Sequence, residues 1–387
     1  MPVKMGISGC RRGRSFLKTA TLAGFEVWAV IDPDEDTRNG LGEASGVPES
    51  RRFSDYNAML DSGVEVVLVS SPMPYHAPQA VAALKRDIHV LSEVTAATSL
   101  QQCLRLRDTA QASSATYMMA ENYTYRKPVQ LVMGMVEAGL FGDVYYTEGQ
   151  YLHNVRDIYV LPDGGHTWRG CWQLSRRGLT YPTHSIGPAL KWMKERVVSL
   201  SARGSGTRTW NDVTGDDSAV MLCQTASGKL VNIRTDLASR RPHNMTYYQL
   251  QGTKGCYEAP RGLGDDHKVW LLDYHGDDEN SWHSLWDFEE KCLPEIWRQY
   301  AESAAKAGHG GGDLLELVEF AEAIGGESSP DLDVYTALDW TMTALISELS
   351  VEQGGASLEV PNPRNDELDR AAAIEAASGR FTETDMV

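Results

Sequence analysis

The chain has 387 residues, 42% of them apolar and 23% charged, and 53 acidic residues against 36 basic ones give a formal net charge of −17. This composition is that of a folded globular protein and excludes disorder over most of the chain. The acidic surplus argues against general binding to nucleic acid or anionic membranes, because both need a positive field. No apolar run reaches the roughly 20 residues that span a bilayer.

The N-terminus MPVKMGISGC lacks the long apolar stretch and the small-residue cleavage site of a signal peptide, so we expect a cytoplasmic protein. Its six cysteines lie far apart and form no C-x-x-C pair. We therefore expect reduced thiols, with neither a disulfide framework nor a metal site.

Short apolar strands alternate with helices over the first 120 residues. The predicted strands are Val3–Ser8, Glu26–Ile31, Glu65–Val69, Asp87–Leu91 and Thr116–Ala120. The predicted helices between them are Ser15–Ala23, Tyr56–Leu60, Ala77–Lys85 and Leu100–Ala112. This order predicts an α/β fold with a doubly wound parallel sheet of the Rossmann type.

The pattern changes after about residue 123. A helix at Lys127–Ala138 precedes further strands, predicted at Asp143–Leu152, Ser218–Gln224, Leu230–Asp236, Thr246–Gly252 and Val269–Asp273. Helices are predicted at Leu314–Ala323 and Tyr335–Val351. Because few helices separate the strands, we expect an α+β domain with a largely antiparallel sheet. The predicted domains are 1–122, 123–361 and a loose polar arm at 362–387.

The first strand runs into a glycine-rich turn, Gly6-x-x-Gly9-Cys10-Arg11-Arg12-Gly13. Such a strand-to-helix turn lets the backbone approach a pyrophosphate. Arg11 stands where the usual motif has glycine, so an ordinary tight turn is the alternative. Asp32 ends the second strand, where a carboxylate can bind the ribose hydroxyls and repel a 2′-phosphate. The pattern favours NAD over NADP, although the nearby Arg38 keeps NADP open.

The third strand ends in Ser70-Ser71-Pro72-Met73-Pro74-Tyr75-His76. A loop of small residues at this end of a parallel strand faces the ligand crevice. We therefore take Ser71 and His76 as cofactor-binding candidates; an ordinary helix-start residue is the alternative for His76.

These features, with the segments at 70–80 and 87–93, resemble the Gfo/Idh/MocA oxidoreductases. Members of that family pair a Rossmann domain with an open-faced sheet domain. The resemblance implies NAD as the cofactor and Glu93 as a cofactor-binding residue. The family's Glu-Lys-Pro signature reads Glu93-Val94-Thr95 here, and the missing lysine commonly holds the reacting hydroxyl in family dehydrogenases. A net sugar or cyclitol dehydrogenase is therefore the alternative function.

The downstream part resembles the NAD-dependent glycoside hydrolases, such as family 109 α-N-acetylgalactosaminidases. The blocks that carry the resemblance are AENY (120–123), GLFG (139–142), EGQYLH (148–153), WR (168–169), YPTHSIGP (181–188), GTKG (252–255), HGGGD (309–313) and DVY (333–335). The resemblance covers roughly residues 1–361. It implies active-site roles for Glu121, Tyr151, His153, Tyr181 and His184, with Glu121 also beside the cofactor.

A conventional glycosidase uses two carboxyl groups, whereas these blocks supply mainly tyrosine and histidine. The resemblance implies transient oxidation at sugar C3, deprotonation at C2, elimination of the aglycone, addition of water and re-reduction. On a strand, Tyr151 and His153 project from one face. If a helix begins near Pro182, His184 lies in its first turn. We expect His184 and Tyr181 to move protons at C3 and C2, with Tyr151 and His153 assisting and Glu121 positioning sugar or nicotinamide.

Candidate substrate residues lie beside these blocks. Arg176-Arg177 precede Tyr181, where the galactosaminidases tend to have an asparagine-glycine-asparagine run, and Lys191 and Lys194 follow. Cations there would suit a sulfonated sugar, as in the related NAD-dependent sulfoquinovosidases; a solvated basic surface is the alternative. The full set is Trp168, Arg169, Arg177, Lys194 and His309.

The HGGGD segment has two interpretations. Either His309 contacts the sugar from a closing loop, or the segment is a linker in which Asp313 caps the next helix. For the whole protein, we expect a small-molecule glycoside as substrate and, by family analogy, a homo-oligomer. A non-catalytic NAD-binding protein is a further alternative.

Overall fold

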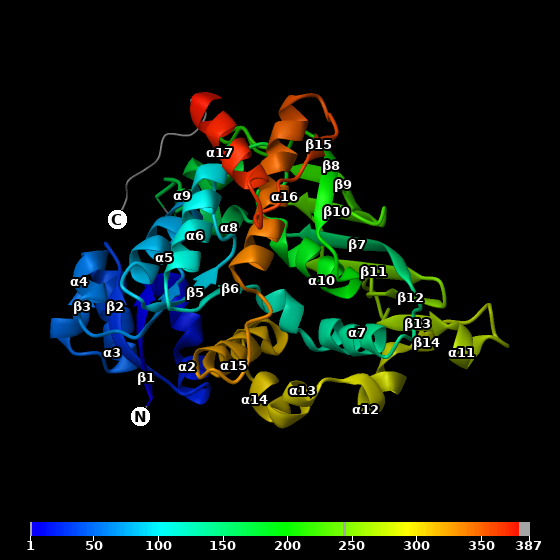
Figure 1. Cartoon of the computed structure of the whole chain (residues 1–387), viewed down its shortest axis with the longest axis horizontal. Helices are drawn as coiled ribbons and strands as arrows, with labels where there is room; N and C mark the ends of the chain where they lie inside the picture. The colour runs from blue at the N-terminus through cyan, green and yellow to red at the C-terminus, as the bar shows by residue number, and fades with distance from the viewer. Residues whose placement is uncertain (1, 162, 243–244, 379–387) are drawn as a thin grey trace. The chain divides into compact units, whose positions relative to one another are not determined.

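The computed structural model describes residues 2–161, 163–242 and 245–378, which fall into two compact units (Figure 1). Unit 1 holds the chain up to Tyr125, then Tyr300–Thr341 and the residues from Pro361 on. Unit 2 holds Arg126–Gln299 and Met342–Val360. The sequence-based boundaries treat each domain as one continuous stretch, whereas two later segments of the chain return to unit 1.

Unit 1 contains a six-stranded sheet in the order β3-β2-β1-β4-β5-β6, and its neighbouring strands pair in parallel. Its strands are β1 (Val3–Ser8), β2 (Phe25–Ile31), β3 (Arg52–Phe53), β4 (Val66–Val69), β5 (His89–Glu93) and β6 (Tyr117–Ala120). This is the strand order of a Rossmann fold, and it reverses direction between β1 and β4. The predicted fold class is confirmed for this part of the chain.

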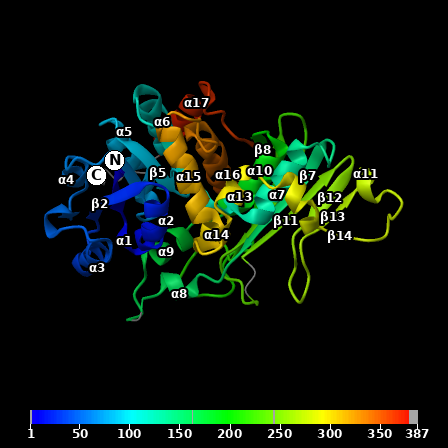
Figure 2. The same cartoon turned by 90° about the horizontal axis from the view of Figure 1, so that it is seen from below.

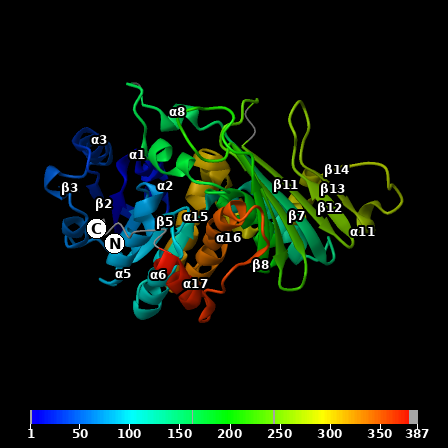
Figure 3. The same cartoon turned by 90° about the horizontal axis from the view of Figure 1, so that it is seen from above.

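Helices cover both faces of this sheet. The helices α2 (Leu17–Leu22) and α3 (Glu35–Ser45) lie on one face, and α5 (His76–Leu84) and α6 (Leu100–Ala112) lie on the other (Figures 2 and 3). The side chain of Asp34 caps α3 by accepting the Thr37 N–H, and Ser99 caps α6 in the same way through Gln102. Sequence analysis missed α3. The single helix predicted at Ser15–Ala23 is divided into α1 (Cys10–Gly13), a 3₁₀ turn and α2.

The C-terminal segment corrects one prediction. Residues expected in a loose arm form the helix α17 (Glu367–Ser378), which packs on α6. Arg107 of α6 donates to both carboxylate oxygens of Asp369. Glu375 accepts the backbone N–H groups of Leu100 and Gln101 and so satisfies the start of α6. Polar composition therefore did not mean disorder here; residues 379–387 lie outside the described part.

Unit 2 contains a nine-stranded sheet in the order β14-β13-β12-β11-β7-β10-β9-β8-β15. Within the described residues, β7 and β10 pair in parallel and the other neighbouring strands pair antiparallel. Its strands are β7 (Val144–Leu152), β8 (Val197–Gly204), β9 (Ser218–Thr225), β10 (Leu230–Asp236), β11 (Thr246–Gly252), β12 (Gly255–Glu258), β13 (Lys268–Leu271), β14 (His283–Ser284) and β15 (Leu358–Glu359). The expected largely antiparallel sheet is confirmed, although the strand predicted at Val269–Asp273 ends at Leu271 and turns into the helix α11 (Leu272–His275).

One face of this sheet lies against the helices α7 (Lys127–Glu137) and α10 (Thr183–Met193) (Figure 2). On β9 the burial alternates, with Met221 and Cys223 buried and Val220 and Leu222 exposed. A strand with one buried and one exposed face gives this pattern. Among the described residues, no helix is both long enough and apolar enough to cross a membrane.

Candidate active site

The glycine-rich turn follows β1 directly and lies against the end of β4. Gly9 has φ +87°, and a Cβ there would lie 2.4 Å from both Ser70 O and Ser71 N. A Cβ on Gly13 would lie 2.3 Å from the side chain of Ile7. Gly9 is therefore needed for the turn itself, and Gly13 is needed for close packing of the helix on the strand.

Asp32 stands beside this turn at the end of β2. Its carboxylate accepts the Cys10 N–H at 2.9 Å and the Asp34 N–H at 3.0 Å, while Arg38 donates to the Asp32 carbonyl at 2.8 Å. A carboxylate at this edge suits the ribose hydroxyls of NAD, so the residues present fit the cofactor. Burial, followed by the charge of Asp32, raises the pKa of the Cys10 thiol to about 12, so the thiol stays protonated. Arg11 is exposed.

The loop after β4 is joined to the loop after β5 through His76. Its ring is buried, with Nε2 2.7 Å from Ser71 O and Nδ1 2.8 Å from Thr95 O. Burial lowers the pKa of His76, which favours a neutral ring that donates to only one of the two carbonyls. Ser71 donates its hydroxyl to Gln79 at 2.8 Å.

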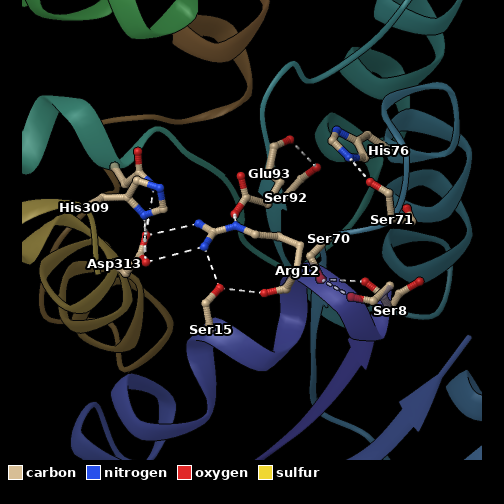
Figure 4. A network of polar contacts seen from close by, with 12 residues as sticks. Ser8, Arg12, Ser15, Ser70, Ser71, His76, Ser92, Glu93, His309 and Asp313 are labelled. Atoms are coloured by element: carbon tan, nitrogen blue, oxygen red, sulfur yellow. Dashed lines mark hydrogen bonds and ion pairs between the residues drawn. The ribbon is translucent and has the colours of Figure 1, made fainter. Parts of the chain in front are cut away.

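Arg12 is the centre of a polar network within unit 1 (Figure 4). Its Nε donates to Glu93 at 2.6 Å, and its Nη2 donates to Asp313 at 3.1 Å. Asp313 also accepts from Asn122 Nδ2 at 2.8 Å and lies 2.9 Å from His309 Nδ1. The structure thus brings together three predicted residues, Arg12, Glu93 and His309. The partly buried guanidinium is thus bound by two carboxylates, which compensate its charge.

Two carboxyl groups near Arg12 differ in ionisation. Although burial opposes the charge of Asp313, hydrogen bonds and charges from His309 and Arg12 hold its pKa well below the usual range. Glu316, one helical turn further on, is 0% exposed, and neither of its carboxyl oxygens has a hydrogen-bond partner among the described residues. Burial, followed by the charges of Asp313 and Glu93, raises the pKa of Glu316 well above its usual value. Asp313 is therefore ionised, whereas the neutral acid is favoured at Glu316.

The interpretation that Asp313 caps the helix after the HGGGD segment is wrong. The helix α15 (Gly312–Ile324) begins after Gly311, so Asp313 is in its first turn and binds side chains instead of capping the backbone. His309, Gly310 and Gly311 have φ of 51°, 67° and 96°. This left-handed backbone is costly for a non-glycine residue, by about 1–3 kcal/mol. The His309–Asp313 contact helps to offset that cost.

Four of the predicted catalytic side chains lie together in unit 2, on β7 and the start of α10. A Cβ on Gly149 would lie 2.3 Å from Ser185 O, so the helix lies directly on the strand at this point. This close approach places the ring of Tyr151, on the same face of β7, with its centroid 5.3 Å from that of His184. Tyr181, just before α10, meets His184 edge-on at 4.8 Å.

Tyr151 and His153 of this cluster are within hydrogen-bonding distance of each other. Tyr151 OH lies 2.9 Å from His153 Nδ1, and the exposed fractions of Tyr151 and His184 are 5% and 6%. Tyr248 of β11 donates its hydroxyl to the His184 carbonyl at 2.5 Å and so fixes the start of α10. Sequence analysis missed Tyr248, because its position on a central strand looks like ordinary core. None of the four side chains is a carboxylate. Tyrosine and histidine side chains suit proton transfer, and histidine does so near neutral pH.

Glu121, the fifth predicted catalytic residue, belongs to unit 1. It follows β6 and is fully buried, and its Oε1 accepts the Tyr123 N–H at 3.2 Å. Asn122, its neighbour, is the residue that binds Asp313. Neither Asn122 nor Asp313 was predicted as a site residue. The spacing of four residues between His309 and Asp313 is a signal that could have indicated contact between those two side chains.

The predicted substrate residues of unit 2 all have protein partners. Arg177 Nε donates to Asp216 at 2.9 Å, and the neighbouring Arg176 binds Glu348. Arg169 donates to Gln173 at 2.7 Å and lies over the ring of Trp168. Lys194 is half-exposed, with Nζ 3.7 Å from Glu137. Both arginines before Tyr181 are therefore neutralised by carboxylates of this chain.

No cluster of three or more histidine, cysteine or acidic side chains that could hold a metal ion occurs among the described residues. The titratable groups gather instead around Arg12 in unit 1 and around His184 in unit 2. The cluster around Arg12 is therefore built from ion pairs, and the cluster around His184 is built from tyrosine and histidine side chains.

Known families match both parts of the chain. Residues 3–121 match the oxidoreductase family with an NAD-binding Rossmann fold, and residues 125–366 match the C-terminal domain of glycosyl hydrolase 109. A glycosyl hydrolase family 109 protein of Saccharopolyspora erythraea is 29% identical over 392 residues, covering 93% of this chain and 83% of that protein. An α-N-acetylgalactosaminidase of Tannerella forsythia is 27% identical over 390 residues, covering 88% of this chain and 81% of that protein.

Solved structures show the same fold at low sequence identity. Levoglucosan dehydrogenase in complex with NADH and levoglucosan superposes with a TM-score of 0.80 at 17% identity, covering 94% of this chain and 100% of the other. The WlbA dehydrogenase of Bordetella pertussis, in complex with NADH and UDP-GlcNAcA, gives 0.71 at 19% identity, covering 93% and 98%. With its NAD-binding Rossmann domain and its second domain matched over most of its length, the chain belongs to the glycosyl hydrolase 109 family within the Gfo/Idh/MocA oxidoreductases.

Proposed function

We propose that this protein is an NAD-dependent glycoside hydrolase that cleaves its substrate through a temporary oxidation of the sugar. The tyrosine–histidine cluster of Tyr151, His153, Tyr181 and His184 carries the proposal, because it offers proton-transfer groups without the carboxylate pair of a conventional glycosidase. NAD, when bound, would supply a reversible hydride acceptor for the C3–H bond of the sugar. Asp32 and the turn at Gly9 would hold it.

The chain's own residues would move the protons. His184 and Tyr181 would take the proton from the C3 hydroxyl and from C2, in an order that is left open. The contact between Tyr151 OH and His153 Nδ1 gives a second pair through which a proton can pass toward C2 or the leaving-group oxygen. Each positioned acid or base contributes on the order of 10²- to 10⁴-fold to the rate. Glu121 and His309 would position the sugar or the nicotinamide.

For the substrate we propose an uncharged, N-acetylated hexoside. Two observations support it over a sulfonated sugar. The arginines before Tyr181 are bound by Asp216 and Glu348, which reduces their attraction for an anion. In addition, a relative with 27% identity is named an α-N-acetylgalactosaminidase.

A glycoside panel tests the activity and the substrate together. The purified protein with NAD is given N-acetylated, neutral and sulfonated glycosides in D₂O, while absorbance at the reduced-nicotinamide band is recorded. We expect release of the aglycone, deuterium at sugar C2 and no net build-up of NADH. Stoichiometric NADH would instead identify a sugar dehydrogenase, and full-rate cleavage after removal of NAD would contradict the proposed mechanism.

We also propose that the protein forms a homo-oligomer through the open face of the sheet. Val220 and Leu222 of β9 are 42% and 50% exposed there. Exposed apolar side chains on a sheet face favour association. Light scattering on the wild type and on a Leu222→Lys variant checks this, and a monomeric wild type would contradict it.

A further inference from the structure

Asp313 is surrounded by hydrogen-bond donors that use both of its oxygens. Oδ1 accepts from Asn122 Nδ2 at 2.8 Å and from Arg12 Nη2 at 3.1 Å. His309 Nδ1 lies 2.9 Å from Oδ2 and 3.0 Å from Oδ1, and Arg12 Nη1 donates to Oδ2 at 3.4 Å. The Asp313 side chain is 0% exposed, so these contacts are not exchanged with solvent.

The contact with His309 decides where the imidazole carries its proton. An ionised carboxylate can only accept hydrogen bonds, so Nδ1 of His309 must be the donor. In the neutral ring, Nε2 is then the nitrogen with the lone pair, on the far side of the ring from Asp313 (Figure 4). The half-exposed ring can therefore present an acceptor to a ligand.

We propose that Asp313 is a positioning residue that fixes the tautomer and the direction of His309, and that Arg12 and Asn122 hold Asp313 in place for this purpose. Because Arg12 lies on the glycine-rich turn, the segment that would bind the cofactor and the segment that carries His309 are joined by one carboxylate. The consequence for catalysis rests on the proposed function, since it requires that His309 meets the sugar. The tautomer itself does not depend on it.

The groups facing this contact come from several elements. Arg12 lies on α1, Glu93 on β5 and Glu316 on α15, and Glu121 follows β6. The Tyr123 ring lies with its centroid 6.1 Å from that of His309. Of these groups, Arg12 donates to Asp313, and His309 Nδ1 lies within 3.0 Å of both carboxylate oxygens of Asp313. The Nδ1 proton is therefore assigned to Asp313.

Asp313→Asn is the sharpest test, because the surrounding donors dictate how the amide turns. Asn122 and Arg12 Nη2 donate to Oδ1 at 2.8 and 3.1 Å, whereas Arg12 Nη1 contacts Oδ2 only at 3.4 Å. The amide oxygen of the variant should therefore take the Oδ1 position, and its NH₂ should take the Oδ2 position beside His309. The imidazole must then accept at Nδ1 and carry its proton at Nε2. The expected change is a complete exchange of tautomer with nearly the same shape of side chain.

Nitrogen NMR on protein labelled with ¹⁵N-histidine measures this directly, at a pH where the ring is neutral. The His309 signals are assigned by their loss in His309→Asn. We expect the Nδ1–H tautomer in the wild type and the Nε2–H tautomer in Asp313→Asn. A wild type with the Nε2–H tautomer, or an unchanged tautomer in the folded variant, would overturn the proposal; if the variant does not fold, the wild-type spectrum alone decides.

Glu316→Gln is the matched control. It makes the same carboxyl-to-amide change on the same helix, at an equally buried position whose carboxyl oxygens have no hydrogen-bond partner among the described residues. We expect it to keep the wild-type tautomer, and an exchange of tautomer in this control would also overturn the assignment to Asp313.

If the proposed glycosidase activity holds, Asp313→Asn should lower kcat by roughly 10- to 10³-fold, with KM and the Kd for NAD changed less than about 2-fold. A change confined to KM would contradict a positioning role. The NMR result needs no substrate, so a failure of the proposed function and a failure of this inference are distinguishable.

Discussion

Two clusters of polar side chains, one in each unit, are built on different principles. Around Arg12, formal charges are bound to one another, because the partly buried guanidinium pairs with the buried carboxylates of Glu93 and Asp313. Around His184, the groups are aromatic and weakly acidic or basic, and they meet through ring contacts and one hydrogen bond to His153. Buried ion pairs fix positions, since breaking one leaves an uncompensated charge. Groups such as tyrosine and histidine can exchange protons, so the second cluster is the one suited to acid–base chemistry.

The same contrast occurs between two neighbouring acids of α15. Asp313 has donors on both oxygens and is ionised, whereas Glu316 has none among the described residues and its pKa is raised. Burial is complete in both cases. The donors supplied by other segments, and not the depth of burial, therefore decide the charge state.

The largest effect is expected from His184→Ala, which removes the central imidazole of the aromatic cluster. We predict a fall in kcat on the order of 10²- to 10⁴-fold, because a positioned acid or base contributes that much. NAD binding should be retained, since Asp32 and the Gly9 turn belong to unit 1. Steady-state kinetics and calorimetric NAD titration measure the two. Near-normal turnover of a folded variant would remove His184 from the proposed chemistry.

Asp32→Ala tests the proposed binding site for the NAD ribose in unit 1. Losing a charged hydrogen-bond acceptor costs about 1.5–3 kcal/mol, so we predict a roughly 10- to 100-fold weaker Kd for NAD. Affinity for NADP should fall less, because the repulsion of a 2′-phosphate is removed. Calorimetric titration of both cofactors decides this, with Asp36→Ala on the exposed start of α3 as the control. Equal losses for NAD and NADP would place the ribose site elsewhere.

Glu316→Gln tests the raised pKa through the pH dependence of stability. In the folded protein the acid keeps its proton above the usual glutamate pKa of about 4.3, at which the unfolded chain releases it. The wild type therefore loses stability relative to the variant as pH rises above that value. We predict that the wild type and the variant have equal stability at about pH 4 and that the variant is more stable at about pH 7. Urea unfolding measures both. A gap that does not grow with pH would contradict the neutral acid.

The smallest effect is expected from Tyr248→Phe, which removes only the hydroxyl bound to the His184 carbonyl. A buried hydrogen bond contributes about 1 kcal/mol to the free energy of unfolding. We predict a loss of about that size, with kcat lowered by less than about 10-fold because the imidazole remains. Denaturant unfolding and kinetics on the same preparation test both. A loss of kcat as large as that of His184→Ala would show that Tyr248 takes part in the chemistry.

Much of the fold could be predicted, because its signals are local. The strand Val3–Ser8, the helix Leu100–Ala112 and the strands Leu230–Asp236 and Thr246–Gly252 have the predicted bounds. Apolar runs and their periodicity set these elements. The helix α17 could not be predicted, since it depends on Arg107 and on the start of α6, which are far away in the sequence.

The sequence by itself determined the doubly wound parallel fold class, the glycine turn with Asp32 and the family of the chain, because these depend on residue types at fixed spacings along one segment. Only the tertiary structure decided that Arg12 is held by Glu93 and Asp313, and that Tyr248 supports His184. These contacts join residues up to 301 positions apart. Long-range pairs of this kind leave no periodicity in the chain, so their partners are fixed only when the whole unit has packed.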